Sequence, residues 1–162
     1  MPFYRRLGHV PAKRHTQHRQ PDGSLYAEEL AGAEGFSSDS SLLYHRHAPT
    51  AIVDAVAVEE DPAPLVPNHP LLPRHVRAHE LKVGGDLATG RQVLFGNADV
   101  RVSYVASDVD SPLYRNAHGD ELVFVESGAA VLESIYGRLA VGPGDYVVIP
   151  TSTTHRWVVD AD

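Results

Sequence analysis

The sequence predicts an all-β, mainly antiparallel fold, and three observations carry this prediction. The 162 residues include 12 prolines and 13 glycines, which favour short strands and turns over long helices. From residue 113 onward, β-branched and apolar runs recur at the spacing of roughly 8 to 12 residues that is typical of sandwiches and barrels. Glycine or proline turns separate these runs. Helical content is therefore expected to be low.

The C-terminal strands are the most strongly indicated. Their apolar residues alternate with polar ones or form short buried-type runs, and a tight corner is expected at residues 142–145, which read GPGD. Strands are expected at residues 121–126, 130–136, 139–141, 146–149 and 155–159.

The middle of the chain contains further strand candidates between proline clusters. Residues 61–67 hold three prolines, so they are expected to form a loop or an edge and not a central strand. The candidate strands are residues 51–58, 76–83, 91–95 and 100–106.

The N-terminal residues are polar and rich in turns. Pro21-Asp22-Gly23 predicts a tight turn, and residues 25–30 are the only part expected to form a short helical turn. This stretch is expected to be an irregular arm that wraps around a core supplied by later residues or by another chain. The predicted organisation is therefore an arm over residues 1–50 and a β-barrel over residues 51–162.

The net charge of −7 is unevenly distributed. Of the 14 basic residues, five lie in the acid-free residues 1–20, so the remaining nine face all 21 acidic residues. Such a basic start is found in transit peptides and nucleic-acid arms. We predict an ordered arm that lies against its own acidic body or a neighbouring subunit, with no nucleic-acid partner. The five residues are Arg5, Arg6, Lys13, Arg14 and Arg19.

The composition excludes several classes of protein and site. The absence of cysteine excludes disulfides, a thiolate nucleophile and cysteine-ligated metals, so a metal could bind only histidine, carboxylate or other oxygen ligands. No apolar run approaches the roughly 20 residues that a membrane span requires. With no further targeting signal, a cytoplasmic location is expected.

The most specific local pattern is G-D-x4-P-x4-H, formed by Gly144, Pro150 and His155, with Glu121 seven residues before Gly128. These residues resemble the two motifs of the cupin superfamily, which are small β-barrels of the jelly-roll type. The resemblance implies a cupin-type jelly-roll barrel for residues 51–162. In this chain the barrel is expected to be incomplete, stopping before its final strands.

The family's metal ligands are not reproduced. The two histidines of the first cupin motif would fall at Tyr114 and Asn116, or at Arg115 and Ala117, and none of these is histidine. A two-histidine, one-carboxylate centre needs three converging ligands. We therefore predict no metal site and no catalytic residue in this barrel, and interpret Glu121 and His155 as polar side chains that are hydrogen-bonded inside the barrel or at its mouth.

An alternative is a small metal-dependent oxygenase that uses the three weak candidates His118, Glu121 and His155. His118 precedes Glu121 by three positions, which places the two side chains on opposite faces of a regular strand. Elsewhere, His45 and His47 share one face of an extended segment and could form a metal pair, although packing or an interface is the favoured interpretation. We interpret four other histidines as surface or interface positions, namely His15, His18, His75 and His79.

Longer runs resemble a specific family. Residues 2–5, 13–17, 21–30, 35–47 and 116–122, which read PFYR, KRHTQ, PDGSLYAEEL, GFSSDSSLLYHRH and NAHGDEL, are similar to bacterial homogentisate 1,2-dioxygenases. That resemblance implies an extradiol-type enzyme that opens the homogentisate ring with O2 and Fe(II) to maleylacetoacetate in tyrosine and phenylalanine breakdown. It further implies a two-barrel protein that assembles as trimers and hexamers.

This chain matches the N-terminal part of such enzymes, whereas their iron ligands lie in the C-terminal barrel. The resemblance therefore implies that this segment serves as scaffold and subunit interface, and that by itself it binds no cofactor and is inactive. The basic arm would then be a strap between subunits. The alternative is a stand-alone, non-catalytic cupin that acts as a binding or interaction module.

Overall fold

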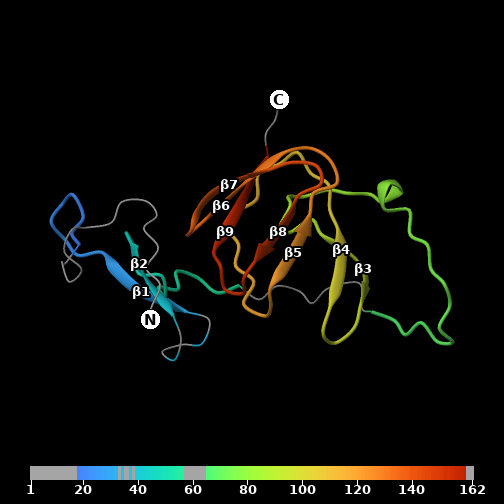
Figure 1. Ribbon diagram of the computed structural model, residues 1–162, viewed down its shortest axis with the longest axis horizontal. Coiled ribbons are helices and arrows are strands. Elements are labelled where there is room, and N and C mark those ends of the chain that lie inside the picture. The colour runs from blue at the N-terminus through green and yellow to red at the C-terminus, as the bar shows by residue number, and fades with distance from the viewer. Residues whose placement is uncertain (1–17, 33, 35–36, 38, 57–64, 160–162) are drawn as a thin grey trace. The chain divides into compact units, whose positions relative to one another are not determined.

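The computed structural model describes residues 18–32, 34, 37, 39–56 and 65–159. The chain divides into two compact units, Met1–Glu59 and Glu60–Asp162. Over the described residues the regular elements are nine strands, all paired antiparallel, and one 3₁₀ turn, η1 (Ala78–Glu80) (Figure 1). The predicted all-β, mainly antiparallel class is confirmed. No helix in these ranges is long and apolar enough to cross a membrane.

The first unit contains a β-hairpin where only a helical turn was expected. Strand β1 (Ala27–Gly32) pairs with β2 (Ser40–His45) along its whole length. The helix prediction for residues 25–30 was wrong, because pairing with a strand further along the chain outweighs the weak local helix preference of Ala27-Glu28-Glu29-Leu30. The predicted turn before β1 is confirmed, with Gly23 at φ +86° and Asp22 Oδ1 accepting the Ser24 N–H at 2.9 Å.

Two other expected strands are not strands. Residues 51–56 form no strand, with Ile52 and Val53 84% and 98% exposed, and residues 57–58 lie outside the described residues. In the range 76–83 the chain forms η1, where the side chains of Arg77 and Glu80 form an ion pair at 2.9 Å. β-branched residues do not make a strand without a neighbouring strand to pair with, and neither segment has one among the described residues.

The second unit begins its regular structure with a bulged hairpin. Strand β3 (Gln92–Gly96) pairs with β4 (Arg101–Tyr104), and the register shifts between Val93 and Phe95. Asn97 Oδ1 accepts the N–H groups of Asp99 and Val100 at 2.8 Å, which closes the turn. Both strands confirm the sequence prediction. Of the proline-rich residues 61–67, residues 61–64 lie outside the described part, and residues 65–67 form no strand.

Five strands form the rest of the second unit, where each was expected. Strands β5 (Glu121–Phe124) and β8 (Tyr146–Ile149) form one sheet, and β6 (Ala130–Ser134) lies between β7 (Gly137–Val141) and β9 (His155–Val159) in another. Although β6 and β7 lie between β5 and β8 in the chain, they belong to the other sheet. The sheets remain separate and do not close in the described residues, as expected of an incomplete barrel.

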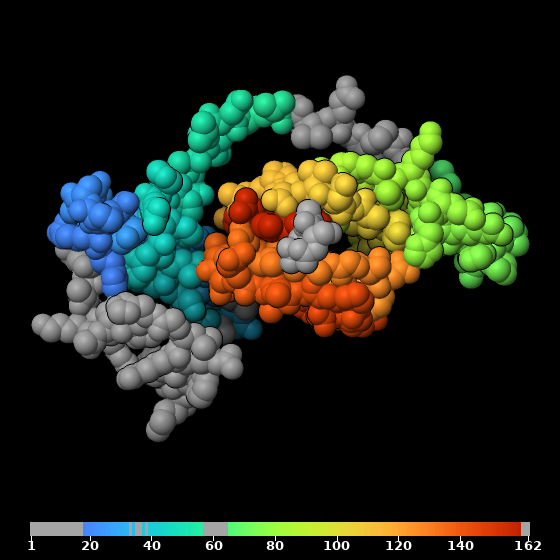
Figure 2. Space-filling model, turned by 90° about the horizontal axis from the view of Figure 1, so that it is seen from above, coloured from blue at the N-terminus to red at the C-terminus, as the bar shows by residue number. Residues whose placement is uncertain are grey.

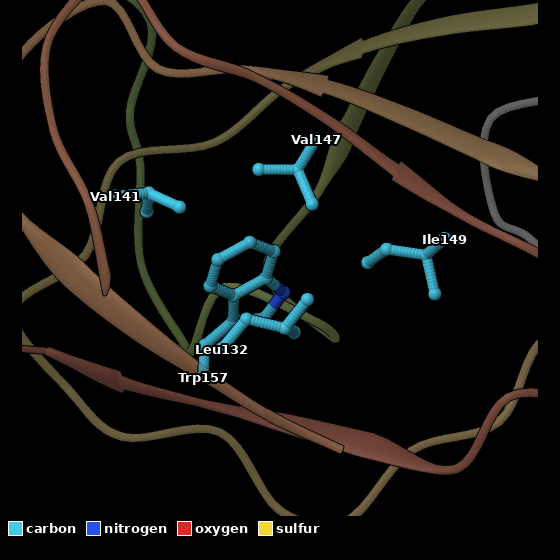
Figure 3. Close-up of a cluster of buried hydrophobic side chains, with 5 residues drawn as sticks. All are labelled: Leu132, Val141, Val147, Ile149 and Trp157. Carbon is cyan, nitrogen blue, oxygen red and sulfur yellow. The ribbon is translucent and has the colours of Figure 1, made fainter. Parts of the chain in front are cut away.

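The core lies between these two sheets. On β8, Val147 and Ile149 point inward, whereas Tyr146 and Val148 are exposed. Trp157 of β9 is 3% exposed and packs with Leu132 of β6, its register partner. Figure 3 shows these side chains converging with Val141 from the two sides of the core. Alternation along the strands therefore determines which face of each sheet is buried.

The opposite face of the β5–β8 sheet is apolar and uncovered in the second unit. We call it the outer β5–β8 face; Leu122 and Val148 form one register pair, and Phe124 and Tyr146 form the next. The four side chains are between 52% and 68% exposed, and the two aromatic rings lie 4.7 Å apart. Contiguous exposed apolar patches are uncommon on monomeric proteins and are typical of interaction surfaces.

Candidate functional site

The segment before β5 runs along β9 and brings polar side chains to the inner side of the second unit. Tyr114 and His155 exchange backbone hydrogen bonds of 2.8 and 2.9 Å, and the Ser111 N–H donates to the Trp157 carbonyl at 2.9 Å. Figure 2 shows the last strand, in red, between this yellow-to-orange segment and the orange β6 and β7. Residues 111–116 thus act as an additional, irregular strand beside β9.

Five side chains form what we call the inner polar cluster: Arg91, Tyr114, Asn116, Glu121 and His155. At its centre is Glu121, the first residue of β5, whose side chain is 8% exposed. Arg91 Nη2 lies 2.9 Å from Glu121 Oε2, and Asn116 Nδ2 donates to Oε1 at 3.1 Å. The Arg91 contact is an ion pair and not an aligned hydrogen bond, since Oε2 has no donor in hydrogen-bonding geometry within the described residues. A buried carboxylate requires such compensation by charge and hydrogen bonds.

His155 is 1% exposed and has a defined tautomer in its neutral form. Its Nδ1 lies 2.9 Å from the Thr153 carbonyl oxygen, and because a carbonyl only accepts, Nδ1 must carry the hydrogen. The lone pair of the neutral ring is then on Nε2. That atom is buried and has no hydrogen-bond partner among the residues described. His155 therefore presents an unused acceptor inside the second unit.

Tyr114 connects the two ends of the cluster through its ring. The Tyr114 and His155 ring centroids lie 5.5 Å apart in an edge-to-face arrangement. The guanidinium carbon of Arg91 also lies 5.4 Å from the Tyr114 centroid, within cation–π range. The cation, the carboxylate and the imidazole are thus parts of one contact network.

The electrostatics follow from this arrangement. Burial acts to raise the pKa of Glu121, but the positively charged Arg91 guanidinium and the Asn116 hydrogen bond outweigh it, so the pKa lies below its ordinary value of 4.5. Burial, together with the negative charge of Glu121, raises the pKa of the Tyr114 hydroxyl above 10.0. Near neutral pH, Glu121 is therefore ionised and Tyr114 is neutral.

The three metal-ligand candidates do not converge. Glu121 and His155 belong to the inner polar cluster, whereas the His118 side chain is exposed and its backbone N–H donates to Asn116 Oδ1 at 2.9 Å. No group of three histidine or acidic side chains in the described ranges could hold a metal ion. The residues present also do not fit ferrous iron chemically, because the carboxylate is paired with a guanidinium that stays protonated.

Sequence reasoning missed three members of the cluster. Tyr114 and Asn116 occupy the positions at which the cupin pattern expects histidines, so the motif spacing located them without assigning them a role. Arg91 lies 30 residues before its partner Glu121, and nothing in the local sequence indicates that pair. Only the fold brings the start of β3 to the start of β5.

The remaining histidines have separate environments. His45 Nε2 lies 2.8 Å from Glu29 Oε2 across the β1–β2 hairpin, a carboxylate partner that the sequence did not indicate, while His47 is exposed. His79 pairs with Glu126 at 3.1 Å on the surface, and His75 is exposed. The His18 ring lies 4.5 Å from that of Tyr44, and His15, like most of the basic N-terminal arm, lies outside the described residues.

Comparison with known proteins finds a similarity that covers nearly the whole chain. The chain is 35% identical over 157 residues, 96% of its length, to a protein of Saccharolobus solfataricus that is named "putative dioxygenase". It spans about 41% of the length of that relative. No family model matches the chain, and no solved structure matches it. A dioxygenase is thus the class of protein to which nearly the whole chain is similar.

Proposed function

We propose that the chain is the N-terminal part of a cytoplasmic homogentisate 1,2-dioxygenase and serves as its scaffold and subunit interface. The relative named as a dioxygenase supports the general class. The sequence runs given above support the homogentisate-type substrate and ring cleavage with O2. Fe(II) would supply oxygen activation in the complete enzyme.

One observation carries the scaffold role. The inner polar cluster holds the cupin-motif carboxylate Glu121 in an ion pair with Arg91, at a position where a metal-binding cupin would use the carboxylate as a ligand. A divalent cation at this carboxylate would have to displace a fixed positive charge. The iron of the complete enzyme is therefore assigned to residues outside this chain, and this barrel contributes packing surface.

Complementation tests this function. We expect the chain alone to contain no stoichiometric iron and to consume no O2 with homogentisate, because its ligand set does not fit iron. Co-expression with the remaining part of the Saccharolobus solfataricus relative is expected to restore O2 uptake on homogentisate. Iron content by elemental analysis and O2 uptake by electrode are the measurements, with catechol and gentisate as comparison substrates.

Two results would contradict the proposal. Stoichiometric iron with turnover in the isolated chain would show that this barrel is itself catalytic. Restored O2 uptake with another ring substrate, and none with homogentisate, would retain a dioxygenase but reject the proposed substrate.

Self-association is the second part of the proposal. The outer β5–β8 face is exposed, and a second copy of the chain is the partner that the trimers and hexamers of the resembling family imply. We expect Val148→Lys to lower the weight-average mass in light scattering, because a charge buried in an apolar contact between two copies is strongly unfavourable. Because Val148 is exposed in the single chain, the substitution is expected to leave folding intact. Leu139→Lys on β7, where the native side chain is 53% exposed, is the matched control. A monodisperse wild-type monomer at high concentration, or equal effects of both variants, would reject this interface.

A stand-alone binding or interaction module is the second candidate function, and the same outer β5–β8 face favours it. In that case the isolated chain would be a stable monomer and would bind a defined partner without any second barrel. Complementation separates the two candidates, because only the first predicts that a second part restores O2 uptake.

A further inference from the structure

We propose that Arg91 is a built-in cation that takes the place of a metal ion in this barrel, and that Glu121 and His155 accept a small external cation once the guanidinium is removed. The proposal concerns the inner polar cluster by itself and does not depend on the homogentisate substrate. It assigns the barrel a latent cation site whose native occupant is a side chain.

Arg91 is held as a fixed group and not as a flexible surface charge. Its Nε donates to the Leu87 carbonyl oxygen at 3.0 Å, which orients the plane of the guanidinium. Its Nη2 contacts Glu121 at 2.9 Å, and its central carbon lies 5.4 Å from the Tyr114 ring centroid. Three different contacts, with only 25% of the side chain exposed, place a permanent positive charge at the carboxylate.

Two side chains of the inner polar cluster, Glu121 and His155, offer acceptor atoms. Glu121 presents a buried carboxylate, and His155 presents the buried Nε2 lone pair that has no partner in the described part of the chain. Asn116 does not belong to the acceptor set, because its Oδ1 accepts the His118 and Gly119 N–H groups while its amide nitrogen donates to Glu121. A carboxylate and an imidazole nitrogen are typical ligands of Zn²⁺ and Co²⁺.

The charge balance predicts what happens when the guanidinium is lost. The native cluster pairs one buried anion with one cation, so removal of Arg91 leaves Glu121 as an uncompensated buried charge. The protein then either loses stability or takes up a cation from solution. Replacing Glu121 with glutamine as well removes the charge and, with it, the demand for a cation.

Chemical rescue of Arg91→Ala is the experiment. We expect its melting temperature to fall by about 5–10 °C, and low millimolar guanidinium or micromolar Co²⁺ to recover at least half of that loss. Neither guanidinium nor Co²⁺ is expected to raise the melting temperature of wild type, and EDTA is expected to leave it unchanged. The double variant Arg91→Ala/Glu121→Gln is the matched control and is expected not to respond to either cation. Co²⁺ binding to Arg91→Ala is read independently from its visible absorption spectrum.

Several results would overturn the proposal. These are an Arg91→Ala protein as stable as wild type, an equal cation response in the double variant, or stoichiometric Co²⁺ binding by wild type. If Arg91→Ala does not fold, Arg91→Lys and wild type keep the proposal testable. Arg91→Lys retains a cation, so it is expected to melt within a few degrees of wild type and not to respond to Co²⁺. A rise in the melting temperature of Arg91→Lys or wild type on addition of Co²⁺ would reject a resident cation.

Discussion

Replacing Trp157 with alanine is expected to lower the free energy of unfolding by about 3–5 kcal/mol. The ring is 3% exposed and fills the space between the two sheets, packed with Leu132, Val147 and Ile149. Alanine would leave a large cavity that the strands around it cannot close. Because a domain of this size is stable by only about 5–15 kcal/mol, this one change removes a large fraction of its stability.

Urea unfolding followed by circular dichroism measures this effect. Fluorescence is unsuitable because Trp157 is the only tryptophan of the chain. The neighbouring Arg156→Ala is the control, since this partly exposed side chain pairs with Glu133 at the surface and is expected to cost less than about 1 kcal/mol. A Trp157→Ala protein as stable as the control would mean that the core is not where the structure places it.

Replacing Glu121 with glutamine is expected to lower the free energy of unfolding at pH 7 by about 1–3 kcal/mol. The change leaves Arg91 without its anion and removes a charge-assisted hydrogen bond from Asn116. The cost is smaller than for a fully buried pair, because a quarter of the Arg91 side chain remains in water. Glu126→Gln, at an exposed ion pair with His79, is the matched control and is expected to change little.

The Glu121–Arg91 ion pair also predicts how the free energy of unfolding changes with pH. The pKa of Glu121 is lower in the folded state than its ordinary value of 4.5, so its stabilising effect is fully present above that value. It is lost as the pH falls through the lowered folded-state pKa, where the carboxylate becomes protonated. The stability difference between wild type and Glu121→Gln should therefore be largest near neutral pH and shrink below pH 4.5. A constant difference across that window in urea titrations would contradict the ion pair.

Local pattern was sufficient for the C-terminal strands and insufficient for the N-terminal hairpin. The C-terminal strands are predictable because glycine or proline turns separate them and because inward and outward residues alternate along β8, as Val147 and Val148 illustrate. Strand β1 is not, because Glu28 and Glu29 favour a helix locally and only pairing with β2 makes them extended. The exposed Ile52 and Val53 show the converse, since their β-branched side chains form no strand without a partner.

The sequence by itself determined the antiparallel all-β class, the positions of most strands and the absence of cysteine chemistry. It also located Tyr114, Asn116, Glu121 and His155 through the cupin spacing. Only the tertiary structure decided what these residues do, because the group that neutralises Glu121 is Arg91, which lies 30 residues away in the chain. Short-range periodicity specifies backbone geometry and burial, whereas compensation of a buried charge depends on which distant side chains the fold brings within contact distance.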